Sequence, residues 1–268
     1  GKTDPDDAPE IQKEAVSKAG DLWIMGPHRL LCGDCSEYKD VEKLFDGGLA
    51  TVAVTSPPYA SQRKYDESSG FKPIHPDRYI EWFTPIQDNI SSFLEPDGSW
   101  FMNIKEHAED GQRHLYVKDL LLAHVREWGW KWVDEFAWIH GGTPKGVQQR
   151  FKNGWEPIFQ FTRVRHKFRP ENVRHKSKGD VDWGGRHPSK NDGHGLRYTT
   201  DKEHISTGES QGHSKGKTGS YKASDGMAYP SNVLSLGHNH ESLGHAAAYP
   251  IGLPEFFICA FSDVGAVS

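Results

Sequence analysis

Residues 49–59 read LATVAVTSPPY, a stretch in which an apolar run meets two prolines. The run Leu49–Thr55 is rich in β-branched residues and has the pattern of a buried strand. Prolines stay out of sheet interiors because each withholds a hydrogen-bond donor and fixes its own φ angle. The strand is therefore expected to end in a stiff turn at Ser56–Tyr59. Ligands of open parallel sheets bind at the carboxyl ends of the strands, which makes this turn a candidate site.

The sequence on either side of the turn alternates between strand patterns and helix patterns. Short apolar or alternating runs predict strands, and apolar residues spaced three or four apart predict helices. The expected strands are 22–25, 28–32, 49–54, 99–104, 131–139, 157–162 and 232–236, and the expected helices are 39–46, 79–94, 113–128 and 254–261. Because strand and helix alternate from 30 to 139, we expect an α/β fold with parallel strands in its sheet.

The composition limits the class of protein. The 268 residues suffice for one or two domains, and the net charge of -5 does not by itself indicate a nucleic-acid-binding protein. No apolar run approaches the ~18 residues that span a bilayer, and no leader pattern is seen, so we expect a cytoplasmic protein without a membrane partner. The three cysteines are too few for a disulfide framework, and Cys32 and Cys35 lack the further ligands of a zinc site.

One long segment departs from the alternating pattern. Residues 166–228 contain 12 lysines and arginines against 8 aspartates and glutamates, with little apolar periodicity. Two interpretations stay open: a disordered insertion, or a basic surface that faces a polyanion. We therefore expect a polar arm at 1–20, an α/β region at 21–163, a basic and partly disordered insertion at 164–230, and a return to the α/β region at 231–268.

The residue types in the turn suit the recognition of an amine on a planar ring. The two prolines remove two amide donors, so the backbone carbonyls of the turn are less used by local hydrogen bonds. These carbonyls and the Ser56 hydroxyl can accept hydrogen bonds from an NH₂ group, while the Tyr59 ring can stack on the plane that carries it. The turn contains no cysteine, which argues against a covalent adduct with a ring carbon.

An apolar strand followed by Ser56-Pro-Pro-Tyr59 resembles the catalytic motif of the S-adenosylmethionine-dependent DNA amino-methyltransferases, which methylate exocyclic amines of bases. Other segments resemble this family in the expected order: His28–Asp34, Leu94–Phe101, Arg150–Phe161, His245–Pro250 and Phe261–Gly265. Catalytic motif first and cofactor segment last is the order of the permuted β group. One departure is Ala246, which stands where the family usually has proline.

This resemblance implies a Rossmann-like methyltransferase sheet, permuted and incomplete, with a loop-rich basic insertion for target recognition. The implied cofactor is S-adenosylmethionine, and the implied substrate is double-stranded DNA from which one base is flipped out. The implied roles are catalytic for Ser56, Pro57, Pro58 and Tyr59; cofactor-binding for Asp34, His245, Tyr249 and Pro250; and DNA-binding for Lys167, Arg169, Arg174, Lys176, Arg186 and Arg197. No metal site is implied, and a restriction endonuclease is a candidate partner.

The target base and the activity have alternatives. Serine in the first motif position is associated in this family more often with cytosine N4, and aspartate with adenine N6, so we expect cytosine N4 with adenine N6 as the alternative. In the β group the segment resembling Phe261–Gly265 leads into a glycine-rich cofactor loop, which we expect after Ser268. A DNA-binding chain that is inactive without this loop is therefore a further alternative. An RNA or protein-amide substrate is less favoured by the long basic insertion.

Overall fold

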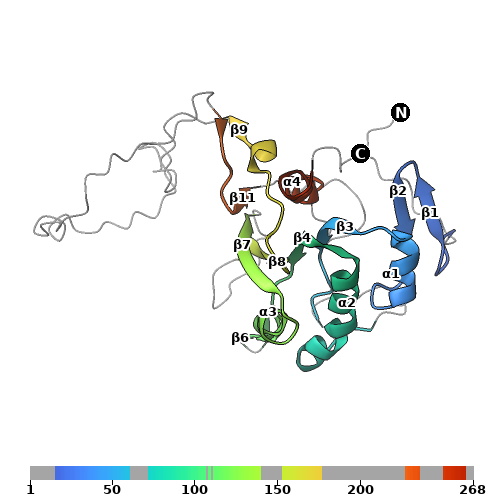
Figure 1. Cartoon of the computed structure of the whole chain (residues 1–268). Coiled ribbons are helices and arrows are strands. Elements are labelled where there is room, and N and C mark those ends of the chain that lie inside the picture. Colours follow the sequence, from blue (N-terminus) through green and yellow to red (C-terminus); the bar gives the residue numbers. More distant parts are fainter. Residues whose placement is uncertain are drawn as a thin grey trace, which may run out of the picture. The chain divides into compact units, whose positions relative to one another are not determined.

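The computed structural model describes residues 16–60, 72–106, 108–109, 111–139, 153–176, 227–235 and 250–263 (Figure 1). The chain divides into two compact units. The first unit consists of residues 1–173 and 230–268, and the second of residues 174–229. The first unit thus keeps residues 164–173, which the sequence analysis assigns to the basic insertion.

The centre of the first unit is a five-stranded sheet with the strand order β11-β7-β8-β4-β3. Its strands in chain order are β3 (Ala50–Thr55), β4 (Leu94–Asn103), β7 (Lys131–Ile139), β8 (Trp155–Thr162) and β11 (Val233–Ser235). The pairs β3–β4 and β11–β7 are parallel, whereas β8 runs antiparallel to both β4 and β7. The α/β class is thus confirmed. β3, β4 and β7, which lie in the alternating stretch, run in the same direction, whereas β8, which follows that stretch, is antiparallel to its neighbours. This strand follows β7 in the chain and pairs directly with it, and such returns are antiparallel because a parallel neighbour needs a crossover.

The remaining elements of the first unit surround this sheet. They are β1 (Leu22–Met25), β2 (His28–Leu31), α1 (Tyr38–Phe45), η2 (Pro76–Arg78), α2 (Tyr79–Phe93), β5 (Ala108–Glu109), β6 (Gln112–Arg113), α3 (Tyr116–Arg126), η3 (Pro170–Val173) and α4 (Gly252–Phe261). The strands β1 and β2 form their own antiparallel hairpin, so the expected strand at 28–32 exists but does not belong to the main sheet. In the second unit, β9 (His175–Lys176) pairs with β10 (Met227–Ala228). Within the described residues, no helix combines the length and apolar character needed to cross a membrane.

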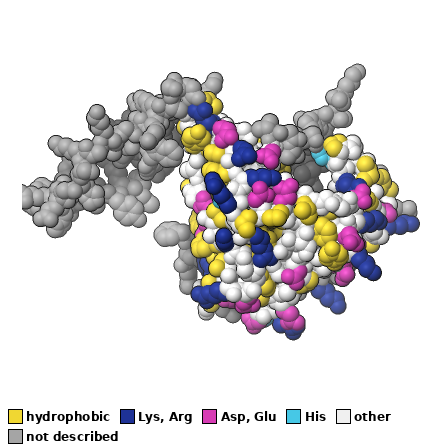
Figure 2. Space-filling model, viewed as in Figure 1, with side chains coloured by type: hydrophobic (Ala, Val, Ile, Leu, Met, Phe, Trp, Pro, Cys, Tyr) yellow, Lys and Arg dark blue, Asp and Glu magenta, His cyan; other side chains and the backbone are white. Residues whose placement is uncertain are grey.

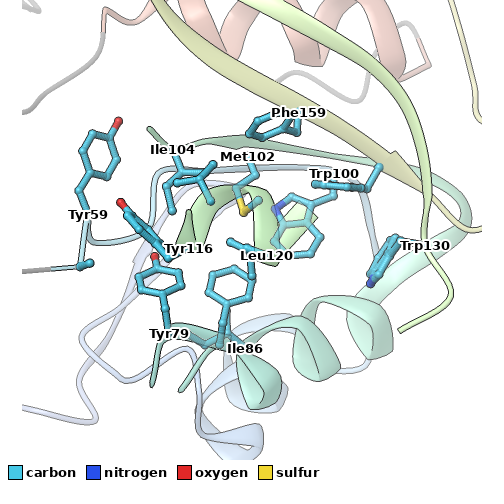
Figure 3. Packing of buried hydrophobic residues seen from close by; sticks show 14 of the residues in the cluster. Tyr59, Tyr79, Ile86, Trp100, Met102, Ile104, Tyr116, Leu120, Trp130 and Phe159 are labelled. Atoms are coloured by element: carbon cyan, nitrogen blue, oxygen red, sulfur yellow. The ribbon is translucent and has the colours of Figure 1, made fainter. Parts of the chain in front are cut away.

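Helices pack on both faces of the sheet, as Figure 1 shows for α2 and α3 on one side and α4 on the other. Side chains alternate along β4, so Trp100 and Met102 join one apolar cluster while Phe101 joins the other. The first cluster also contains Phe83 from α2. Figure 3 labels two further members, Tyr79 from α2 and Leu120 from α3. The second is built around Phe257 and Phe261 of α4. Two covered faces explain why the consecutive residues Trp100, Phe101 and Met102 of β4 are all apolar and buried.

The pairing of β3 with β4 is interrupted by a bulge that includes Gly98 of β4. Ala50 pairs with Leu94 and Val52 pairs with Ser99, so the residues between Leu94 and Ser99 are extra on the β4 side. A Cβ atom on Gly98 would lie 2.8 Å from the Thr51 carbonyl oxygen. That oxygen belongs to the neighbouring strand and cannot turn away. The bulge therefore requires glycine at this position.

Gly98→Ala should lower the free energy of unfolding by about 1–3 kcal/mol, because the methyl group must displace backbone atoms of β3. Denaturation by urea measures this change. The matched control is Gly154→Ala, since a Cβ atom on Gly154 meets nothing within 4 Å. Equal stability of the two variants would contradict the close approach at Gly98.

His124 of α3 is a buried aromatic member of the core. Its ring lies 4.3 Å from the Phe161 ring, centroid to centroid, at an angle of 14°. Its Nδ1 atom lies 2.7 Å from the Leu120 carbonyl oxygen, and its Nε2 atom is buried without a partner in the described structure. Burial lowers the pKa of His124 from 6.5 to about 4, with the nearby Arg163 cation adding to the effect. The imidazole is therefore neutral in the folded protein at pH 7.

This pKa makes stability depend on pH in a defined direction. Below pH 6.5 His124 becomes protonated in the unfolded chain, whereas in the folded chain it stays neutral down to about pH 4. The free energy of unfolding should therefore fall as the pH drops through this window, by up to about 3 kcal/mol from this group.

His124→Phe keeps a ring in the core and should flatten that fall, as measured by the thermal unfolding midpoint between pH 7 and pH 4. The exposed control His28→Gln should retain the wild-type slope. An unchanged slope in His124→Phe would show that other groups cause the pH dependence.

Candidate active site

The carboxyl ends of β3, β4 and β7 lie at one edge of the sheet because these strands point the same way. The antiparallel strand β8 begins at this edge, where Trp155 pairs with Ile139 and Ile158 pairs with Asn103. The edge therefore gathers residues distant in sequence: the turn after Thr55, the end of β4 and the start of β8. These are the positions where an open sheet binds ligands.

The turn after β3 is fixed at the Pro58 carbonyl oxygen. The Tyr79 hydroxyl donates a hydrogen bond to this oxygen at 2.6 Å, and the Ala60 amide lies 3.0 Å from it. Ala60 is fully buried and has a φ angle of 46°, which is uncommon for a residue with a side chain. The residues between Pro58 and Ala60 are thus held by α2 and by their own backbone.

Among the described residues, Ser56 and Pro57 do not take part in hydrogen bonds of this kind. Ser56 is exposed, and within the described part of the chain neither its hydroxyl nor the Pro57 carbonyl has a hydrogen-bond partner. Just before them, the Trp100 indole N–H donates to the Thr55 hydroxyl at 2.8 Å, which fixes the end of β3. The site thus offers two acceptors on a backbone fixed at both sides.

Tyr59 is directed toward the end of the sheet and is mostly buried, with 9% of its surface exposed. Its hydroxyl oxygen lies 3.0 Å from Oδ1 of Asn103 and 2.9 Å from Oε2 of Glu156. Glu156 also forms an ion pair with Lys105. Figure 3 shows Tyr59 at the edge of the cluster that contains Tyr79 and Tyr116. Tyr59 is thus part of the core, and its stacking on a base stays a prediction.

Of the predicted cofactor residues, the described structure places Asp34 and Pro250. The Asp34 Oδ1 atom accepts from the amide and hydroxyl of Ser36 at 2.8 Å and 2.7 Å, and the Asp34 amide donates to Asp40. Within the described residues the second carboxylate oxygen has no partner, so it can accept from the amine or hydroxyls of an adenosine. Pro250 is buried, and its carbonyl accepts from Leu253 at the start of α4. His245 and Tyr249 lie outside the described residues.

Two of the predicted DNA-binding residues are already paired with carboxylates. The Lys167 ammonium lies 2.6 Å from Glu95 and 3.4 Å from Asp263, and Arg169 lies 2.9 Å from Asp263. The hydrogen bond with Glu95 is the main reason that the pKa of Lys167 is raised. These ion pairs link the segment before η3, which carries Lys167 and Arg169, to Glu95 of β4 and to Asp263 just after α4. Each phosphate contact would have to compete with these carboxylates.

The other predicted DNA-binding residues belong to the second unit. There the Arg174 guanidinium lies over the Tyr229 ring, 5.3 Å from its centroid. Lys176 lies in β9, and Arg186 and Arg197 are outside the described residues. On the face shown in Figure 2, lysines and arginines are mixed with aspartates and glutamates over the described part. The described surface on that face therefore offers no continuous basic path for a phosphate backbone.

Sequence reasoning missed four residues that support the turn: Tyr79, Asn103, Lys105 and Glu156. Tyr79 lies on the apolar face of a predicted helix, which gives no sign that its hydroxyl reaches Pro58. Glu156 is an acidic residue at the start of a predicted strand, where a carboxylate needs a buried partner, and this signal could have been used. Within the described segments, no group of three or more histidines, cysteines, aspartates and glutamates could hold a metal ion.

Comparison with known proteins identifies relatives of the same kind. The chain is 24% identical over 255 residues to the type II methyltransferase M.PvuII of Proteus hauseri, covering 84% of this chain and 68% of that protein. It is 33% identical over 142 residues to the type II methyltransferase M.MwoI of Methanothermobacter wolfeii, covering 50% of this chain. The chain spans only 20% of the length of M.MwoI, so this likeness covers a limited part of that protein.

A solved structure supports the fold. The chain resembles a structure titled PvuII DNA methyltransferase (cytosine-N4-specific), with a TM-score of 0.51 and 19% sequence identity. The match covers 82% of this chain and 67% of that one. At this identity the likeness shows the fold, and it confirms the expected Rossmann-like methyltransferase sheet.

The family itself follows from the sequence pattern of the DNA methylases that act on N6 and N4 positions, which matches residues 50–267. This range contains the turn Ser56–Tyr59, the whole of the five-stranded sheet and both apolar clusters. The resemblance seen in the sequence is therefore confirmed, with S-adenosylmethionine as the family's cofactor. The chain belongs to the DNA methylase family of N6/N4 amino-methyltransferases.

Proposed function

We propose that the protein transfers a methyl group from S-adenosylmethionine to the exocyclic N4 amine of a cytosine flipped out of double-stranded DNA. One observation carries this proposal. The Ser56 hydroxyl and the Pro57 carbonyl are neighbouring acceptors at the carboxyl end of β3, and neither has a hydrogen-bond partner among the described residues. An NH₂ group has two hydrogens to donate and matches this pair.

The two acceptors would act on the nucleophile by orientation and charge. The lone pair of the exocyclic amine is conjugated with the ring, so the free amine is a poor nucleophile. Hydrogen bonds from its two N–H groups would localise the lone pair and direct it out of the ring plane. The acceptors need no rearrangement during the reaction, because Tyr79 and Trp100 fix the backbone on either side. Ser56 is not required as a strong base, since the amine becomes acidic once it is alkylated.

The cofactor would supply an electrophilic methyl group on a sulfonium centre. Asp34 fits a role in holding its adenosine, because one carboxylate oxygen is exposed and unused in the described structure. The turn that carries Asp34 is fixed to α2, since the Asn89 side chain donates to the Cys35 carbonyl at 2.9 Å. Roles for His245, Tyr249 and Pro250 in the same pocket remain proposals that rest on the family resemblance.

The choice of cytosine rests on two supports. The first motif residue is Ser56, and serine is the residue associated more often with cytosine N4 in this family. The solved structure with the same fold is titled as a cytosine-N4-specific enzyme. Adenine N6 is the alternative product, and it would use the same two acceptors.

DNA recognition is proposed for the second unit and the segments beside it. Arg174, Lys176, Arg186 and Arg197 are the proposed phosphate or base contacts, while Lys167 and Arg169 are expected to contribute less because carboxylates already pair with them. A restriction endonuclease partner and a cytoplasmic location are proposed from the type II relatives alone.

The proposal is tested with the protein expressed from its complete gene, duplex DNA and methyl-labelled cofactor. Nucleoside analysis of the DNA should find label in N4-methylcytosine. Label in N6-methyladenine would show that the target base is adenine and not cytosine. Binding to DNA without any transfer would favour the inactive DNA-binding alternative and contradict the proposal.

Ser56→Ala should lower kcat about tenfold or more, because the transition state loses one hydrogen bond of about 1.4 kcal/mol. Stability should change by less than about 0.5 kcal/mol, since Ser56 is exposed and the described structure shows no partner for it. The matched control is Ser92→Ala, which changes an exposed serine of α2 whose hydroxyl donates to the Asp88 carbonyl. Equal losses of turnover and DNA binding in Ser56→Ala would show that the serine has a structural role instead.

A further inference from the structure

Lys105 and Glu156 form a largely buried ion pair that the proposed chemistry does not use. Only 17% of the Lys105 side chain and 12% of the Glu156 side chain are exposed. Taking two charges out of water costs several kcal/mol per ion, and mutual attraction often fails to recover this. A buried ion pair is therefore weak evidence for stability, and its place in the structure needs another explanation.

The explanation suggested by the geometry is the contact with Tyr59. Glu156 uses its Oε1 atom for Lys105 and places its Oε2 atom 2.9 Å from the Tyr59 hydroxyl. Oδ1 of Asn103 lies 3.0 Å from the same hydroxyl, and the Asn103 side-chain amide donates to the Pro157 carbonyl at 3.1 Å. The position of the hydroxyl is thus defined by β4 and β8 together.

The backbone of Lys105 is also held in place, by Tyr116. Its backbone carbonyl accepts from the Tyr116 hydroxyl at 2.8 Å. The Tyr116 ring lies 4.8 Å from the Tyr79 ring, and Tyr79 donates to the Pro58 carbonyl. The contacts therefore form a closed path that leaves the turn at Pro58 and returns to it at Tyr59.

We propose that Lys105 and Glu156 are positioning residues for methyl transfer, which act through Tyr59 to hold the Ser56–Pro57 acceptors in place. The group of Tyr59, Asn103, Lys105 and Glu156 is called the Tyr59 clamp below. This inference rests on the proposed function, because the acceptors matter only if an amine is held there.

The clamp acts by limiting movement of the turn. Pro58 and Tyr59 are consecutive, and each is anchored by a different part of the protein, one by α2 and one by β4 and β8. Loss of the Tyr59 hydroxyl contacts would weaken the hold on the turn directly after Pro58, so the segment between the anchors at Thr55 and Pro58 could shift. A misplacement of about 1 Å can lower the rate about 100-fold, so a modest shift of the turn is enough to be measured.

A double-mutant cycle between Tyr59 and Glu156 tests the clamp. Tyr59→Phe removes the hydroxyl and keeps the ring, while Glu156→Gln removes the charge and keeps the size. Each should lower kcat about tenfold, equivalent to about 1.4 kcal/mol of transition-state stabilisation, with the Kd for duplex DNA within about twofold of wild type. The double variant should be no slower than the slower single variant, because both changes break the same link.

Two further variants keep the result interpretable. Glu106 is a carboxylate about as buried as Glu156, and its ion pair in the described structure is with Arg113 rather than with the turn. Glu106→Gln breaks this ion pair and should retain wild-type kcat. If Glu156→Gln unfolds because Lys105 loses its partner, Lys105→Met with Glu156→Gln removes both charges and takes its place in the cycle. The thermal unfolding midpoint of every variant identifies which form is folded.

The outcomes separate this inference from the proposed function. Wild-type kcat in Glu156→Gln, or losses that multiply to about 100-fold in the double variant, would overturn the clamp while leaving methyl transfer intact. Absence of transfer by the wild-type protein would overturn the proposed function instead. In that case the free energies of unfolding of the same four proteins are compared. If the losses of the two single variants add up to the loss of the double variant, Glu156 and Tyr59 are not coupled and the clamp is overturned.

Discussion

The site depends on the two prolines that end β3. A strand paired with β4 along one side would ordinarily use its amide donors and carbonyl acceptors in further pairing. Pro57 and Pro58 have no amide hydrogen, so the ladder stops at Thr55 and the chain turns. The same absence leaves the Pro57 carbonyl without a partner among the described residues, next to an exposed serine. One constraint thus both ends the strand and creates the acceptors.

The rest of the fold holds this turn still. The indole of Trp100 fixes Thr55, the hydroxyl of Tyr79 fixes Pro58, and β4 and β8 fix Tyr59. The donors come from a central strand and from a helix that packs on it, so the positions of the acceptors are set by the aromatic core itself. A site built in this way needs little rearrangement when an amine arrives, which is how hydrogen-bond acceptors contribute to catalysis.

Much of this fold could be predicted from the sequence, because its strands are short apolar runs and its helices have clear apolar faces. The strand at 131–139 and the helix α1 are confirmed almost residue by residue. The direction of β8 could not be predicted, since apolar periodicity does not tell which way a buried strand runs. The two strands of the hairpin β1–β2 were expected, but they form a sheet of their own. This separation could not be predicted, because periodicity does not tell which strands pair with each other.

The candidate site was predicted in part. Ser56 and Pro57 follow from chain order and chemistry as candidate acceptors, and among the described residues neither the Ser56 hydroxyl nor the Pro57 carbonyl has a hydrogen-bond partner, while their role stays a prediction. Tyr79 and Lys105 could not be found in this way, because they are distant in sequence from the turn and neither the Tyr79 hydroxyl nor the Lys105 charge has a periodic signature. The pairing of Lys167 with carboxylates was equally invisible, since Glu95 and Asp263 approach it only in the folded chain.

The most direct test of the account is a crystal structure of the protein with duplex DNA and a cofactor analogue that cannot transfer its methyl group. We expect an extrahelical cytosine whose N4 atom lies within about 3.2 Å of the Ser56 hydroxyl oxygen and of the Pro57 carbonyl oxygen. An extrahelical base whose amine contacts neither oxygen would contradict the account.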